Sequence, residues 1–152
     1  MKKSLGIGLI LTAAVFLTGC GNKFEPTEST IYITSDGAVK SAIMENFDKA
    51  YYDFDELSED VAKEVKTYCL DVNEDVITVE SLTQEGDMVS LFMDYASVED
   101  YVVFNDVLLF YGTYADAVKE GYVPEELYDS EGQNVEMDTE QLGNLKVIVT
   151  EE

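Results

Sequence analysis

Histidine, arginine and tryptophan are absent from the 152 residues of this chain. Without histidine the chain cannot form a Ser-His or Cys-His catalytic pair or a His-ligated metal site. No serine stands three residues before a lysine, so the Ser-x-x-Lys pattern of acyl-enzymes is missing as well. Glycine patterns that cradle phosphate do not occur. These absences exclude most common hydrolase designs and leave carboxylate chemistry.

Basic residues are scarce, since 9 lysines face 32 acidic residues and the formal net charge is −23 at pH 7. Nucleic acid is excluded as a partner, because phosphate binding needs clusters of lysine and arginine. Direct adhesion of the folded surface to anionic lipid is disfavoured for the same reason. The acidity indicates a soluble surface that repels its own copies.

The N-terminus has the layout of a secretory signal peptide. Lys2 and Lys3 precede an apolar run from Leu5 to Leu17, which is shorter than the roughly 20 residues of a membrane-spanning helix. A positive start, a short apolar stretch and small residues before a cleavage point are typical of an export signal. We therefore expect residues 1–19 to be a signal peptide.

The end of this run, Leu17-Thr18-Gly19-Cys20, resembles the lipobox of bacterial lipoproteins. The resemblance implies cleavage between Gly19 and Cys20 and a diacylglyceryl thioether on Cys20, which makes the protein a palmitate-bearing lipoprotein of the cell membrane. One acyl chain holds a protein only reversibly, whereas two or three anchor it stably. Residues 20–29 would be a polar tether and residues 30–152 an acidic domain on the extracytoplasmic face.

Loss of the signal would leave Cys69 as the only free thiol and would remove Lys2 and Lys3, so the formal charge becomes −25. No internal disulfide is then possible. Cys69 lies beside an apolar stripe at helical spacing, which predicts a buried, inert thiol. An apolar content of 46%, with 10 tyrosines and 7 phenylalanines, favours a packed fold over disorder.

The patterning predicts a single α+β domain with a mixed, mainly antiparallel sheet and two or three helices, because strands and helices do not alternate regularly. Asp36-Gly37 and Glu85-Gly86-Asp87 read as hairpin turns. The apolar run Val107–Tyr111 reads as a central strand buried on both faces. We expect strands over residues 30–35, 38–47, 76–84, 88–95, 107–111 and 145–150, helices over 55–72, 97–104 and 113–121, and a helical turn over 125–129.

Two acidic stretches are candidate sites. In the first, three carboxylates stand beside three aromatic side chains, which suits a sugar ring but also a solvated loop that opens a helix. These residues are Tyr51, Tyr52, Asp53, Phe54, Asp55 and Glu56. In the second, Asp71, Asn73 and Asp75 have the alternating oxygens of a calcium loop, yet Val76 and Leu82 stand where an EF-hand needs glycine and glutamate. An irregular calcium site and a polar helix-to-strand turn both remain open there.

Aromatic residues are dense in the second half of the chain and predict mostly core, with a stacking surface as the alternative. They are Tyr95, Tyr101, Phe104, Phe110, Tyr111, Tyr114 and Tyr122. Two stretches, FEPTESTIYIT from Phe24 and FNDVLLFYGTYADAVKEGY from Phe104, resemble small lipoproteins of Gram-positive clostridial bacteria. That resemblance implies a Gram-positive cell surface and adds no catalytic residue.

We therefore expect a lipid-anchored binding or scaffolding module, without a cofactor, that meets a surface protein, a peptide or a glycan. Two alternatives stay open from the residues. One is a carboxylate-dependent enzyme acting on glycans, and the other is a calcium-dependent adhesion module.

Overall fold

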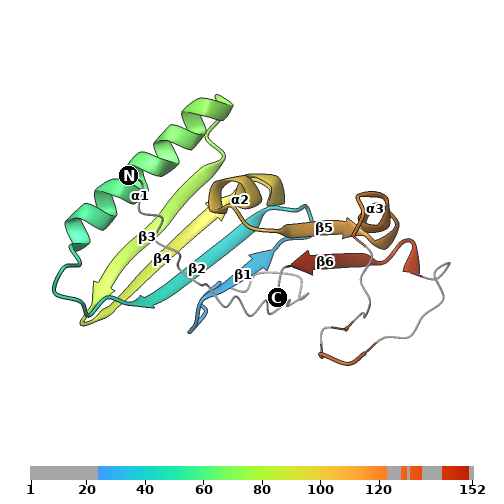
Figure 1. Ribbon diagram of the computed structural model, residues 1–152, viewed down its shortest axis with the longest axis horizontal. Helices are drawn as coiled ribbons and strands as arrows, with labels where there is room; N and C mark the ends of the chain where they lie inside the picture. The colour runs from blue at the N-terminus through green and yellow to red at the C-terminus, as the bar shows by residue number, and fades with distance from the viewer. Residues whose placement is uncertain (1–23, 123–127, 130, 135–141, 151–152) are drawn as a thin grey trace.

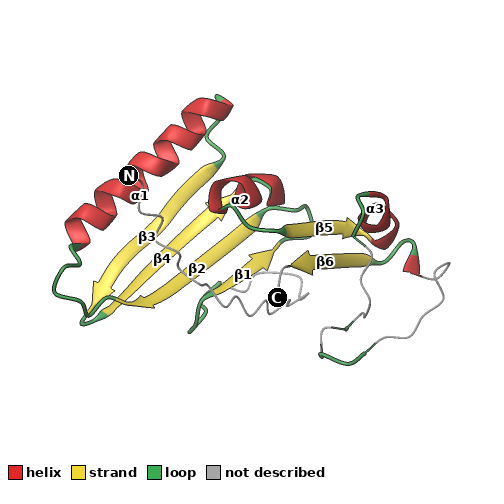
Figure 2. Ribbon diagram, in the orientation of Figure 1, coloured by secondary structure: helices red, strands yellow, loops and turns green. Residues whose placement is uncertain are grey.

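The computed structural model describes residues 24–122, 128–129, 131–134 and 142–150. Within them lie three helices and six strands, as the α+β prediction requires (Figures 1 and 2). The predicted turn at 125–129 falls mostly outside this part. None of the described helices is long and apolar enough to cross a membrane. In chain order the elements are β1 (Thr30–Ile33), β2 (Val39–Asn46), α1 (Phe54–Val72), β3 (Ile77–Glu85), β4 (Met88–Tyr95), α2 (Val98–Asn105), β5 (Leu109–Thr113), α3 (Tyr114–Lys119) and β6 (Lys146–Thr150).

Four strands form an antiparallel sheet in the order β1-β2-β4-β3. Both predicted hairpins are present, and their glycines take positive φ, +91° at Gly37 and +61° at Gly86. A left-handed backbone is cheap for glycine because it has no Cβ. The outer strand β3 carries a bulge between Val79 and Ser81, a feature that discourages further pairing at a sheet edge.

The register of these strands divides the side chains between two faces, because neighbours along a strand alternate. The inner face holds the core. Its buried members are Ile31, Ile33, Val39, Ile77, Met93 and Tyr95, which pack with Cys69, Tyr101 and Leu109 from outside the sheet. The opposite side, here called the open face, consists of Thr30, Tyr32, Lys40, Ala42, Met44, Asn46, Thr78, Ser81, Thr83, Glu85, Met88, Ser90, Phe92 and Asp94.

Helix α1 covers the inner face with the predicted apolar stripe. Val65 and Tyr68 pack against the core, and Cys69 is buried as predicted. Val72, one turn after Tyr68 on the same stripe, is 42% exposed. The helix ends one residue later at Asn73, whose backbone is left-handed and whose N–H bonds back to carbonyls of the last turn. The chain therefore leaves the sheet before Val72 can be buried.

Helix α2 opens with the predicted cap, since the hydroxyl of Ser97 accepts a hydrogen bond from the backbone N–H of Asp100. It delivers Tyr101 and Phe104 to the inner face, where both rings meet Tyr95 edge-on, with centroids 5.0 and 5.9 Å away. Edge-to-face pairs of this kind stabilise a core beyond the area that they bury. Tyr95, Tyr101 and Phe104 therefore belong to the core, as predicted, and Tyr111 packs against it, whereas Phe110, Tyr114 and Tyr122 are only partly buried.

The prediction of a central strand at Val107–Tyr111 was wrong. The strand is β5, it begins at Leu109, and it pairs with β6 in a separate two-stranded sheet. Only Leu109 is buried in it, and Val107 is exposed. A continuously apolar run shows that a strand is apolar, but it does not show how many partners cover that strand.

Candidate functional site

The open face is covered at one place by Phe24, which precedes β1 in the sequence. The Phe24 ring lies 6.3 Å from the ring of Tyr32 on β1 and 6.3 Å from that of Phe92 on β4. Strand β2 runs between those two strands, and its Ala42, level with Phe92, is only 1% exposed. The ring therefore lies across β2, over a residue small enough to admit it.

The segment that follows Phe24 is also held to the sheet. Ser29 donates its hydroxyl hydrogen to the carbonyl of Met44 at 3.1 Å and accepts from the backbone N–H of Met44 at 2.8 Å. These two bonds extend the pairing of β2 beyond the start of β1. Residues 24–29 were predicted to be part of a tether, and in the structure Phe24 and Ser29 contact the sheet.

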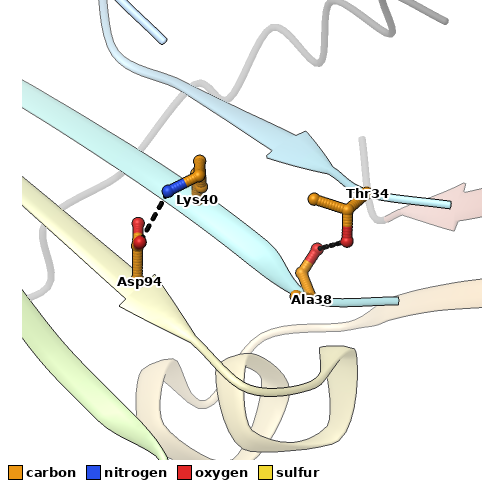
Figure 3. A network of polar contacts seen from close by, with 4 residues as sticks. All are labelled: Thr34, Ala38, Lys40 and Asp94. Carbon is orange, nitrogen blue, oxygen red and sulfur yellow. Dashed lines mark hydrogen bonds and ion pairs between the residues drawn. The ribbon is translucent and has the colours of Figure 1, made fainter. Parts of the chain in front are cut away.

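A hollow of about 220 Å³ opens at the end of the sheet where the β1–β2 turn and the start of β3 lie. Its lining includes Lys40 of β2, Asp94 of β4 and Thr78 of β3, which the register places in one row. The ammonium of Lys40 lies 2.5 Å from the carboxylate of Asp94 (Figure 3). Lys40 is the only lysine on the four-stranded sheet.

The β1–β2 turn forms one wall of the hollow. The hydroxyl of Thr34 donates to the carbonyl of Ala38 at 3.1 Å across this turn (Figure 3). The same hydroxyl bonds the carboxylate of Asp36 and holds the pKa of that exposed group below its usual value. Asp75 lines the hollow from the loop before β3, so two carboxylates, Asp75 and Asp94, border it. Asp94 is already bonded to Lys40, and the hollow is open to solvent, so its groups suit reversible polar contacts.

A second exposed feature lies at the opposite end of the sheet, where β2 passes into α1. The rings of Phe47 and Tyr52 stack with centroids 4.6 Å apart and planes 17° apart, and Tyr51 meets Tyr52 edge-on at 4.9 Å. Tyr51 is 77% exposed. The proximity of Tyr51 raises the pKa of the Tyr52 hydroxyl. We call these three residues the aromatic cluster.

The first predicted acidic site is thus partly assembled. Tyr51 and Tyr52 come together, but their third partner is Phe47, while Phe54 belongs to α1. Asp53 is the N-cap of α1, and its carboxylate accepts from the backbone N–H groups of Asp55 and Glu56 at 2.9 and 3.1 Å. Asp55 lies in the first turn of α1, where its charge favours the start of the helix as expected, and Asp53 adds the N-cap.

The second acidic site is a helix-to-strand turn. Asp71 lies in the last turn of α1, Asn73 is its C-cap, and Asp75 stands before β3. All three side chains are exposed. In the described part of the chain, no group of three His, Cys, Asp or Glu residues is arranged to hold a metal ion.

Gly19 and Cys20, the predicted cleavage and lipidation residues, lie outside the described residues. The structure adds three residues that the sequence did not single out, namely Phe24, Lys40 and Phe47. Phe24 is the one large apolar residue between Cys20 and β1, and Lys40 is the one cation among the predicted strands between residues 30 and 95. The sequence shows that Phe24 and Lys40 differ in chemistry from their neighbours, but it does not show which residues they contact.

Comparison of the chain with protein-family models, with curated proteins and with solved structures finds no match.

Proposed function

We propose that the protein is an extracytoplasmic lipoprotein, anchored by lipid at Cys20, whose α+β domain is a binding module. The observation that carries the proposal is the position of Cys20. It ends a stretch that resembles a lipobox and stands four residues before Phe24, the first of the described residues, whose ring packs on the sheet. Four residues span at most about 14 Å. The lipid would therefore be attached almost directly to the folded part.

The aromatic cluster supports a binding role. Exposed, preformed aromatic faces are enriched where proteins recognise partners, and rings carry negative charge on their faces that attracts C–H groups. Asp48 beside the cluster is ion-paired with Lys49 at 2.5 Å, and the carboxylate of Asp53 would repel an anionic polymer. A neutral sugar ring stacked on Tyr51 and Tyr52 fits both properties.

The glycan-acting enzyme and the calcium-dependent adhesion module remain alternatives, each supported by a few carboxylates. A carboxylate-dependent enzyme acting on glycans would use the hollow, where Asp75 and Asp94 are both present. A calcium-dependent adhesion module would use Asp71, Asn73 and Asp75. A thermal shift of the protein in millimolar calcium would favour the adhesion module, and an unchanged melting temperature would remove it.

Replacement of Cys20 by serine tests the anchor. We expect Cys20→Ser to abolish incorporation of radioactive palmitate and to release the protein from the membrane fraction, because a hydroxyl does not form the thioether. Cys69→Ser is the matched control, since the buried thiol should not be lipidated, and its labelling should be unchanged. Persistent labelling of Cys20→Ser would contradict the proposal.

A double substitution of the aromatic cluster tests the binding role. We expect Tyr51→Ser with Tyr52→Ser to lower retention on immobilised neutral cell-wall polysaccharide at least severalfold, because both stacking faces are lost. The free energy of unfolding should change by no more than about 1 kcal/mol, since exposed side chains contribute little to stability. Tyr128→Ser, another exposed tyrosine, is the control. Equal retention of the double variant and the control would argue against this surface.

A further inference from the structure

We propose that the open face of the four-stranded sheet is the side of the domain that lies against the lipid bilayer, with the headgroup surface as its partner. The inference rests on the proposed lipid at Cys20 and deepens it, because it assigns an orientation to the anchored domain.

The first argument is the length of the link and the place where it ends. Phe24 lies on the open face, between the rings of Tyr32 and Phe92. The chain from Cys20 to Phe24 spans at most about 14 Å, which is less than the thickness of a small domain. A lipid at Cys20 therefore holds this face, and not the helical side, close to the headgroups.

The second argument is the distribution of charge. The charged side chains that the register places on the open face are Lys40, Asp94 and Glu85, of which the first two form an ion pair, and the exposed Glu80 lies in the bulge of β3. Helix α1, which covers the inner face, carries six carboxylates and two lysines: Asp55, Glu56, Glu59, Asp60, Glu64, Asp71, Lys63 and Lys66. An anionic bilayer repels the helical side more strongly, since unscreened repulsion grows with net charge.

The third argument is the chemistry of the open face itself. It presents short hydroxyl side chains from β3, and apolar or aromatic side chains from the other strands, including the exposed Met88 and the partly exposed Tyr32 and Phe92. Tyrosine and other amphipathic groups are favoured at the membrane–water interface. Hydroxyls supply hydrogen bonds to headgroups without adding charge.

The rate at which the native lysines are acetylated can test this orientation, because a lysine that faces the bilayer is shielded from a reagent in solution. The full-length protein, purified with its lipid, would be placed in vesicles of phosphatidylcholine and in detergent, and treated with an acylating reagent that does not cross membranes. Acetylation of each lysine would be counted by mass spectrometry. We expect Lys40 to react severalfold more slowly on vesicles than in detergent, while Lys63 and Lys66 react equally in both.

Phe24→Ala should relax the orientation, because it removes the ring contacts with Tyr32 and Phe92 that hold the start of the domain on the open face. Most of the protection of Lys40 should then be lost while the circular dichroism spectrum is retained. Thr27→Ala, an exposed change in the same segment, should keep the protection.

The failures are distinguishable. A protein that does not float with the vesicles would overturn the lipid anchor and the orientation with it. A protein that floats but shows equal reactivity of Lys40 in both settings, or protection of Lys63 and Lys66 instead, would overturn the orientation alone.

Discussion

Replacement of Tyr95 by alanine should lower the free energy of unfolding by about 3 to 5 kcal/mol, the cost typical of removing a large buried aromatic side chain. Tyr95 is 2% exposed and its ring meets those of Tyr101 and Phe104. The cavity would open between β4 and α2, so Tyr101 and Phe104 would lose a packing partner. Small domains have about 5 to 15 kcal/mol of stability in total, so the loss should be visible as an early urea transition.

Tyr95→Phe separates the ring from its hydroxyl. That hydroxyl donates to the sulfur of Met93 at 3.4 Å and accepts from the side-chain amide of Asn105 at 3.3 Å. Asn105 also donates to the carbonyl of Tyr101 at 2.8 Å, so it keeps a partner when the hydroxyl is removed. We expect Tyr95→Phe to cost only about 1 kcal/mol. A cost for Tyr95→Ala no larger than that would contradict the central place of this ring in the core.

Alkaline pH should destabilise the fold through the buried tyrosines Tyr95 and Tyr101. Burial, and then the neighbouring Tyr95, raise the pKa of Tyr101 from 10.0 to about 12, and burial raises the pKa of Tyr95 as well. Below about pH 10 a tyrosine is neutral in both the folded and unfolded chains. Between about pH 10 and pH 12 the unfolded chain releases the proton while folded Tyr101 keeps it, so stability falls as pH rises.

The expected loss from Tyr101 alone is about 2 to 3 kcal/mol, since each pKa unit corresponds to 1.36 kcal/mol. Urea unfolding measured at several pH values between about 9 and 12 would test it. Tyr101→Phe should lower this pH dependence by that amount, because phenylalanine has no proton to lose. An equal slope in Tyr101→Phe and the unsubstituted protein would show that Tyr101 ionises in the folded state as readily as in the unfolded one.

The local parts of the fold were predictable because their causes are local. Both hairpins follow from glycine-containing turns, and α2 and α3 follow from the caps at Ser97 and Thr113. The inner stripe of α1 follows from helical spacing. These signals need only a few neighbouring residues, so the sequence carries them completely.

The long-range parts were not predictable from pattern alone. Strand β2 pairs with β4, from which it is separated by α1 and β3, and no short-range signal specifies that neighbour. The same limit explains β5, whose apolar run looked central but belongs to a two-stranded sheet. A strand's sequence reports how apolar its surroundings are more reliably than it reports which strands flank it.

The candidate sites also divide into features with local causes, which were predictable, and features with long-range causes, which were not. The start of α1 was predicted to within one residue, while the stacking of Phe47 on Tyr52 depends on how the end of β2 meets the following loop. Phe24 was assigned to the tether because polar residues surround it. Its contacts with Tyr32 and Phe92 arise only once β1 and β4 are brought to either side of β2.

The most direct test of the proposed anchor is the mass of the N-terminal peptide of the mature protein, isolated from the membrane fraction. Cleavage after Lys23 by trypsin should yield a peptide that begins at Cys20 and carries a diacylglyceryl group on its sulfur, with or without a third acyl chain on its amine. A peptide that runs through Gly19 into an unmodified Cys20 would contradict the account.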